Sequence, residues 1–108
     1  MKEKLFVYGT LGLGRPNEHI LGNIGGTWET ATVTGILREE GWGAEMGYPG
    51  IIIDKQGEEV KGFLFTSQNL SPHWENLDKF EGEAYSRIQA KVKLENGRMT
   101  NAYIYTLK

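Results

Sequence analysis

The sequence predicts an α+β fold in which about six strands form a strongly curved sheet or barrel accompanied by two short helices. Segments of strand character dominate the 108 residues. The helical segments do not alternate regularly with the strands, which argues against a doubly wound sheet. Fifteen glycines favour tight turns and bent strands over a flat sheet. The length suits one small domain over residues 1–108.

Strand predictions in the first two thirds of the chain follow from apolar and β-branched runs. Residues 4–8, KLFVY, form an uninterrupted apolar run typical of a buried central strand. Residues 27–39 are rich in Thr and Val and predict a further strand. Residues 51–54 and 60–67 predict a hairpin, with a turn at 55–58 between them.

The last predicted hairpin covers residues 86–107. Two alternating segments flank Asn96-Gly97 there, and such a pair can adopt the positive φ angles that a tight hairpin turn requires. This is the strongest hairpin signal in the sequence.

Both predicted helices are short. Asn17 can cap a helix over residues 18–23. In residues 71–82, SPHWENLDKFEG, Ser71 can cap the N-terminus, Pro72 suits the first helical position, and Gly82 suits the position just past the end.

Glu81 is a charged residue on the face of the second predicted helix that is otherwise apolar. At about 100° per residue, Trp74, Leu77 and Phe80 form the apolar face, and Glu81 falls inside that sector. A carboxyl group packed there would have a raised pKa because burial disfavours its charged form. The alternative is that the helix ends one residue early and Glu81 points to solvent. Asp78 and Glu83 are neighbouring carboxylates that could share its role.

The glycine-rich segment VYGTLGLG, residues 7–14, follows the first strand. Such a loop can present several backbone N–H groups at one spot and bind an anion or a developing negative charge. Its glycine spacing does not fit a dinucleotide-binding fingerprint, because Asn17 stands where the third glycine is needed, and it is not a Walker loop. The alternative is an ordinary tight turn.

Aromatic residues elsewhere allow two interpretations. The loop GWGAEMGYPG, residues 41–50, either lines a pocket with Trp42, Tyr48 and Pro49 or is an ordinary surface loop. The tyrosines that alternate near the C-terminus are expected in the core, and Arg87 is expected to pair with a preceding acidic group. The core tyrosines are Tyr85, Tyr103 and Tyr105.

Composition excludes several classes of function. The net charge of −2 and the scattered Lys and Arg residues do not support a nucleic-acid or anionic-membrane surface. No cysteine is present, so thiol nucleophiles and thiolate metal sites are excluded. His19 and His73 lack metal-ligand spacing. No run approaches the roughly 20 apolar residues of a membrane span, and we expect a cytoplasmic protein.

Three motifs together resemble the γ-glutamylcyclotransferase-like family, which includes γ-glutamylamine cyclotransferases and the plant avirulence-induced proteins. They are FVYGTL…RPNEHIL at 6–21, YPG at 48–50 and LDKFEGEAYSR at 77–87. The resemblance spans nearly the whole chain. It implies a small mixed β-barrel flanked by short helices.

The resemblance also implies roles for individual residues. The family's substrate-binding segment corresponds to Tyr8, Gly9, Thr10 and Leu11, and its catalytic glutamate corresponds to Glu81. Tyr48 and Tyr85 are expected to line the substrate pocket. No metal and no cofactor is implied.

The function implied is conversion of a γ-glutamyl amine or γ-glutamyl amino acid to 5-oxoproline and a free amine. Glu81 would act as general acid and base. One alternative is a binding module for a small carboxylated metabolite. Another is an interaction protein with an exposed surface of Trp28, Trp42 or Trp74. The sequence leaves the oligomeric state open.

Overall fold

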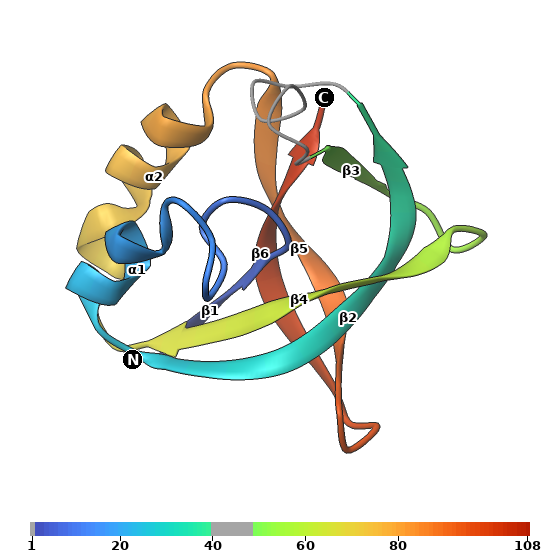
Figure 1. The fold of residues 1–108 in the computed structure, drawn as a ribbon, viewed down its shortest axis with the longest axis horizontal. Helices are drawn as coiled ribbons and strands as arrows, with labels where there is room; N and C mark the ends of the chain where they lie inside the picture. The colour runs from blue at the N-terminus through green and yellow to red at the C-terminus, as the bar shows by residue number, and fades with distance from the viewer. Residues whose placement is uncertain (1, 40–48) are drawn as a thin grey trace.

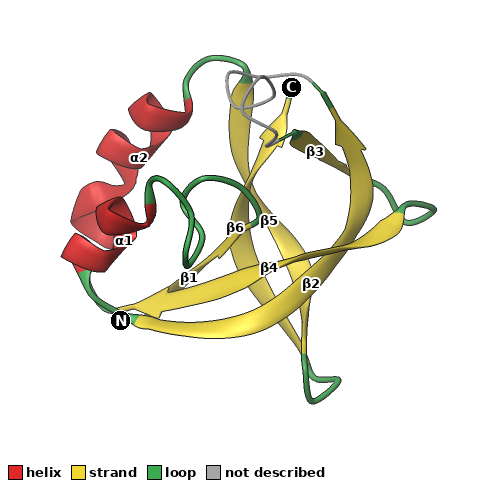
Figure 2. Ribbon diagram, in the orientation of Figure 1, coloured by secondary structure: helices red, strands yellow, loops and turns green. Residues whose placement is uncertain are grey.

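A computed structural model describes residues 2–39 and 49–108 of the chain. The described residues form the strands and helices in the order β1 (Glu3–Val7), α1 (Glu18–Ile24), β2 (Thr27–Arg38), β3 (Gly50–Ile53), β4 (Glu58–Ser67), a 3₁₀ turn (Ser71–His73), α2 (Trp74–Glu81), β5 (Tyr85–Leu94) and β6 (Met99–Leu107). The two helices lie on one side of the sheet (Figures 1 and 2).

Five of the described strands close into a barrel. The sheet order is β3-β2-β4-β1-β6-β5, and a further pairing between β2 and β5 closes the ring, leaving β3 outside it. All pairs are antiparallel except β1 with β6, which is parallel. The predicted small mixed barrel with short helices is therefore confirmed.

The apolar run of β1 reflects its central place between β4 and β6. Leu5 and Val7 belong to a core cluster that also contains Leu21 of α1 and Leu77 of α2. Phe6 belongs to a second cluster, formed by strand residues alone. Successive side chains of a strand point to opposite faces, so the consecutive apolar residues Leu5, Phe6 and Val7 serve both clusters.

The hairpin predicted from residues 51–54 and 60–67 is wrong, because β2 lies between the two strands and pairs with both. Gly35 of β2 is paired with Ile53 of β3 and with Glu58 of β4. The connection crosses over β2 at Gly57, where a Cβ atom would collide with the backbone of Gly35. Only glycine permits this close approach.

The C-terminal hairpin is confirmed: β5 and β6 are antiparallel from the Tyr85–Leu107 pair to the Lys93–Met99 pair. Gly97 has a φ of 85°, whereas Asn96 does not have a positive φ, so the turn is not the two-residue type in which both residues have positive φ angles. The adjacent Arg98 N–H donates to the Asn96 side chain at 2.9 Å.

Neither helix is capped at its N-terminus by the side chain that the sequence predicts. Ser71 does not cap α2: it is the first residue of a 3₁₀ turn that precedes the helix, and its hydroxyl makes no capping hydrogen bond. Asn17 stands at the N-terminus of α1 as predicted, but its side chain makes no capping hydrogen bond either. The end of α2 is as predicted, since Gly82 follows the helix with a φ of 88°.

The tryptophan surface expected for an interaction protein is not formed by the described residues. Trp74 is buried, and its indole N–H donates to Glu3 at 3.2 Å. Trp28 is half-buried and packs on Phe63 and Phe65. Trp42 lies outside the described residues.

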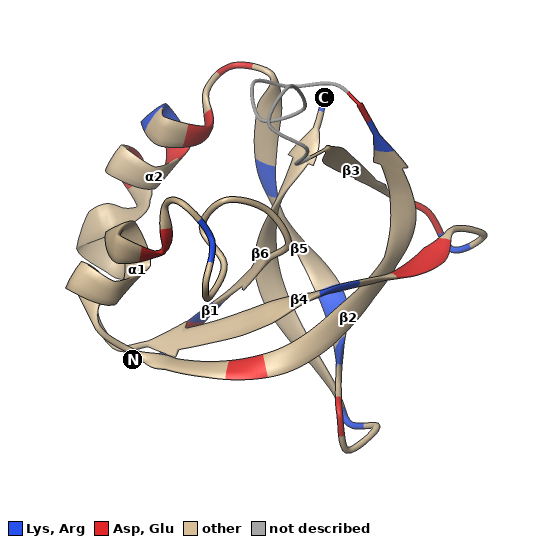
Figure 3. Cartoon of the chain, in the orientation of Figure 1, with Lys and Arg blue, Asp and Glu red and all other residues tan. Residues whose placement is uncertain are grey.

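Acidic and basic residues are interspersed along the described ribbon (Figure 3). None of the helices that the structure describes is long and apolar enough to cross a lipid bilayer.

Candidate active site

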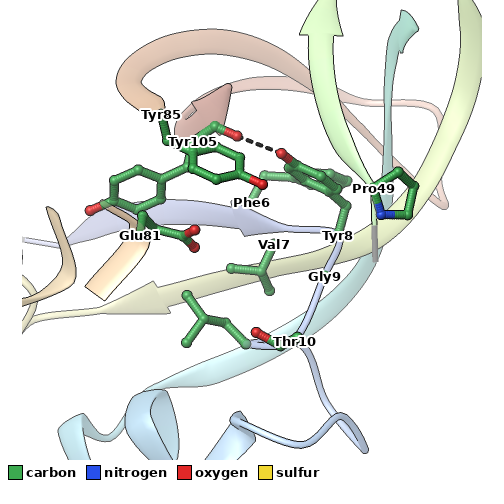
Figure 4. A pocket seen from close by; sticks show the side chains of 10 residues that line it. Phe6, Val7, Tyr8, Gly9, Thr10, Pro49, Glu81, Tyr85 and Tyr105 are labelled. Atoms are coloured by element: carbon green, nitrogen blue, oxygen red, sulfur yellow. Dashed lines mark hydrogen bonds between the residues drawn. The ribbon is translucent and has the colours of Figure 1, made fainter. Parts of the chain in front are cut away.

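A pocket opens where β1 ends. Residues 6–11, Pro49, Glu81, Tyr85 and Tyr105 line it (Figure 4). It holds about 420 Å³ of space, counting its mouth. The strand end, the last residue of α2 and the paired ends of β5 and β6 thus meet at one place, although they are far apart in the sequence.

Glu81 lies in the wall of this pocket, with its carboxylate directed into the space above Val7 (Figure 4). The helix ends at Glu81 because Gly82 turns the chain away, with the Gly82 N–H bonded to the Asp78 carbonyl at 3.0 Å. The predicted position on the packed face is therefore confirmed, and the alternative of a solvent-directed Glu81 is wrong.

The charge state of Glu81 is set by its surroundings. Burial raises the pKa of its carboxyl group from 4.5 to about 7. Within residues 2–39 and 49–108 no hydrogen bond or ion pair to this carboxylate offsets that cost. A carboxyl group with this pKa can release and accept a proton near neutral pH.

The turn at Gly9–Leu11 faces Glu81 across the pocket. Its carbonyl groups are used inside the loop: the Gly9 carbonyl accepts from Gly12 N–H at 3.1 Å, and the Thr10 carbonyl accepts from Asn17 N–H at 2.8 Å. In the described part of the chain no acceptor is hydrogen-bonded to the N–H groups of Gly9, Thr10 or Leu11. Thr10 and Leu11 are buried. The turn therefore meets one requirement of the anion-binding loop that the glycine-rich pattern predicts, and ligand binding by these N–H groups stays a prediction.

Tyr8 lies in the pocket wall, but its hydroxyl is already bonded on both sides. It donates to the Tyr105 carbonyl at 2.7 Å and accepts from the Ile51 N–H at 3.1 Å. The pKa of the phenol is raised by burial. The ring faces the pocket while the oxygen links strands (Figure 4).

Asp78 lies one turn before Glu81 but is part of a different arrangement. Arg87 donates to both of its oxygens, at 2.9 and 3.3 Å, and the Tyr105 hydroxyl donates at 2.7 Å. Burial acts to raise the pKa of Asp78, but these hydrogen bonds and the charge of Arg87 outweigh it, so the pKa is lowered. The predicted pairing of Arg87 with a preceding acidic group is confirmed.

The remaining predicted site residues divide into three groups. Tyr85 lines the pocket, and burial, followed by the charge of Glu81, raises the pKa of its phenol. Glu83 is exposed and is not among the residues that line the pocket. Tyr48 lies outside the described residues, whereas Pro49 beside it does line the pocket.

Tyr105 is a pocket residue that the sequence analysis assigned to the core alone. It is buried in the core cluster and also lines the pocket. The alternation of strand β6 places Tyr103 and Tyr105 on the same face, and no local signal distinguishes them. Only the fold shows that Tyr105 lies at the pocket end of the strand.

Among the described residues, no group of three or more His, Asp or Glu side chains is arranged so that it could hold a metal ion. His19 is exposed on α1 and His73 precedes α2. Neither histidine lines the pocket.

Solved structures with the same fold include three that span nearly all of this chain. YkqA from Bacillus subtilis is 27% identical over 100% of the chain, with a TM-score of 0.74, and the chain spans 36% of that protein. The Arabidopsis thaliana protein At5g39720.1 is 25% identical over 98% of the chain and 68% of its own, with a TM-score of 0.76. An AIG2-like protein from Mus musculus is 23% identical over 97% of the chain and 76% of its own, with a TM-score of 0.73.

A search among curated proteins found no match. A sequence model of the family described as "Gamma-glutamyl cyclotransferase, AIG2-like" matches residues 5–108. That span contains the Gly9–Leu11 turn, Glu81 and all of the barrel strands except the first two residues of β1. The chain therefore belongs to the γ-glutamyl cyclotransferase, AIG2-like family.

Proposed function

We propose that this protein is a cyclotransferase that converts a γ-glutamyl amine or γ-glutamyl amino acid to 5-oxoproline and a free amine. The substrate's α-amine attacks its own γ-carbonyl carbon. A ring N–C bond forms and the original amide C–N bond breaks. The α-ammonium group loses two protons, one before its nitrogen attacks and one as that nitrogen becomes the ring amide. The departing nitrogen takes up both and leaves as an ammonium group. No water is consumed, so atoms and protons balance within the substrate.

The observation that carries this proposal is Glu81, which is half-buried, has no hydrogen-bond or ion-pair partner among residues 2–39 and 49–108, and has a pKa of about 7. At neutral pH part of the protein holds this carboxyl group ionised. In that form it takes a proton from the α-ammonium, and as the resulting acid it gives a proton to the leaving nitrogen. A group that must act in both directions works best when its pKa is close to the ambient pH.

The turn at Gly9–Leu11 supplies the other element of the proposed reaction. Attack on the γ-carbonyl generates an oxyanion, and backbone N–H groups without acceptors in the described protein are suited to stabilise it or to hold the substrate's α-carboxylate. Tyr8 and Tyr85 add ring surface on either side of the pocket. We assign substrate binding to Tyr8, Gly9, Thr10, Leu11, Tyr85 and, on the sequence alone, Tyr48.

Confinement contributes as well. A γ-glutamyl chain in water samples many conformations, few of which bring the amine to the carbonyl. A pocket closed by β1, α2 and the β5–β6 end can hold the chain in the ring-closing conformation, and this lowers the entropic part of the barrier.

A second candidate is a module that binds a small carboxylated metabolite without converting it. The N–H groups of Gly9, Thr10 and Leu11, which have no acceptor in the part of the chain that the structure describes, favour it, since they would hold a carboxylate whether or not a reaction follows. Either function would operate in the cytoplasm, where we expect this cysteine-free chain.

The test is a mass-spectrometric screen for 5-oxoproline release. The library holds γ-glutamyl α-amino acids, ε-(γ-glutamyl)lysine, simple γ-glutamyl amines and glutathione. Wild type, Glu81→Gln and Glu83→Gln are run in parallel; Glu83 is the matched control because it is an exposed carboxylate two residues away. Release by wild type and Glu83→Gln but not by Glu81→Gln supports the enzyme. Ligand-induced stabilisation without any release supports the binding module.

A further inference from the structure

The hydroxyl of Tyr8 joins three strands at one point. Tyr8 itself directly follows β1, the carbonyl that accepts its proton belongs to Tyr105 of β6, and the N–H that donates to it belongs to Ile51 of β3. The two distances, 2.7 and 3.1 Å, are those of ordinary hydrogen bonds.

This arrangement leaves the phenol oxygen little capacity for a ligand. A phenol has one proton to donate, and that proton is used on Tyr105. A substrate could receive it only by displacing a carbonyl acceptor. The raised pKa of the phenol, caused by burial, keeps the donor neutral.

The Tyr8 hydroxyl gives strand β3, which lies outside the barrel, a hydrogen bond on the edge that faces away from β2. One edge of β3 is paired with β2 through the register Leu37–Ile51 and Ile36–Ile52. The Ile51 N–H points the other way, to Tyr8. On the same side, Gly50 lies against the Leu107 side chain, and Ile51 is fully buried in a core cluster that also contains Ile104 of β6.

The hydrogen bond between Tyr8 and Ile51 lies next to two parts of the pocket lining, the Gly9–Leu11 turn and Pro49. The Gly9–Leu11 turn begins at the residue after Tyr8, and Pro49 directly precedes β3. If the Tyr8 hydroxyl is removed, both walls lose an anchor, although the ring that faces the pocket stays in place.

We propose that Tyr8 is a positioning residue whose hydroxyl ties β3 to β6 and thereby fixes the Gly9–Leu11 turn and the Pro49 wall around the substrate. Its ring, and not its hydroxyl, contacts the substrate. The part that concerns the substrate rests on the proposed cyclotransferase function.

The experiment compares Tyr8→Phe with Tyr103→Phe. Tyr103 is the matched control: it lies on β6, it is half-buried against Trp74, and its hydroxyl makes no hydrogen bond to the described residues. Three quantities are measured for each variant: hydrogen exchange of the Ile51 amide, ¹⁵N order parameters of residues 9–11, and kcat and KM on the substrate identified in the screen.

For Tyr8→Phe we expect exchange of the Ile51 amide to rise about tenfold or more, because it loses its acceptor. The order parameters of residues 9–11 should fall from the rigid value of about 0.85. A loosened turn aligns the transition state less often, so kcat should fall about tenfold while KM changes less than threefold. Tyr103→Phe should match wild type in all three measurements.

The proposal is overturned if Ile51 exchange and the order parameters of the turn stay at wild-type values in Tyr8→Phe. It is also overturned if they change while kcat and KM do not. Failure of the cyclotransferase function is a different result, in which wild type releases no 5-oxoproline; the exchange and relaxation data then still decide whether Tyr8 holds the two walls.

Wild type alone provides a measurement should Tyr8→Phe fail to fold. Tyrosine-specific ¹³C labelling follows the ionisation of each phenol with rising pH. A Tyr8 phenol fixed between Tyr105 and Ile51 stays neutral well above its ordinary value of 10. Ionisation of Tyr8 at its ordinary value would overturn the assignment.

Discussion

Asp78 and Glu81 are carboxylates one turn apart on the same helix, and the fold gives them opposite properties. Asp78 is held by Arg87 and by the Tyr105 hydroxyl, and its pKa is lowered. Glu81 faces a pocket with no such partner in the described protein, and burial raises its pKa to about 7. The comparison teaches that partners, and not residue type or helix position, separate a carboxylate that holds the fold together from one that can exchange protons.

The Asp78 arrangement also supports Glu81. Arg87 lies 4.4 Å from the centroid of the Trp74 ring and 5.1 Å from that of Tyr103, so its guanidinium is stacked on rings from both α2 and β6. Through Asp78 it fastens the last turn of α2 to β5 and β6. Glu81, the residue that we propose transfers protons, is thus placed by a neighbouring carboxylate whose pKa is lowered.

The largest expected effect is on catalysis, where substitution of Glu81 should lower kcat/KM far more than substitution of Asp78. Because a general acid–base group contributes about 10²–10⁴-fold, Glu81→Gln should lower kcat/KM by that factor. Asp78→Asn removes only a support and should lower it by about tenfold or less. Steady-state kinetics on the substrate found in the screen measures both. Equal losses in the two variants would contradict the division of roles.

The second prediction concerns pH. Since Glu81 must be ionised to accept the first proton, kcat/KM should rise with pH through a pKa of about 7 and then level off. A pH–rate profile of wild type between pH 5 and 9 measures this, with buffers chosen to keep the ionic strength constant. A profile that is flat across pH 7 would mean that Glu81 is not the base.

The third prediction concerns stability. The pKa of Glu81 is raised in the fold from 4.5 to about 7, so ionising it destabilises the folded state above that range and not below it. Glu81→Gln should therefore increase the free energy of unfolding by about 1–3 kcal/mol at pH 8. The increase should shrink through pH 7 and vanish below pH 4.5. Urea unfolding at several pH values measures it.

The fourth prediction concerns the stability of Asp78→Asn. It is the smallest effect, and its sign is opposite to that of Glu81→Gln. The lowered pKa of Asp78 means that its ionised form stabilises the fold at pH values above its ordinary pKa of 3.8, and that this is lost as the pH falls through the lowered value. Because the pair with Arg87 is partly exposed, Asp78→Asn should cost about 1 kcal/mol at pH 7. Unfolding in urea at pH 7 and pH 3 measures it, and an equal cost at both would contradict the sign.

Much of this fold could be predicted because its signals are local. The run LFVY marks a strand with apolar neighbours on both faces, and Asn96-Gly97 marks a turn. Periodicity alone placed Glu81 on the packed face of its helix, and the structure agrees. In each case the information lies within about ten residues of sequence.

What could not be predicted depends on contacts between distant segments. The pairing of β3 with β2 instead of β4 is made possible by Gly57 crossing Gly35, two residues 22 positions apart in the chain numbering. Likewise, Tyr105 differs from Tyr103 only in what the barrel brings next to it. Periodicity reports which face a residue occupies, and not which segment covers that face.

The parallel pairing of β1 with β6 has a consequence for how the chain folds. Leu5 is paired with Tyr103, so the barrel closes only once strands from opposite ends of the sequence have met. Contacts with such a large sequence separation make folding slow. During synthesis the apolar β1 must wait, partly uncovered, until β6 leaves the ribosome. We therefore expect the pocket, whose walls come from both strands, to be the last part of the molecule to form.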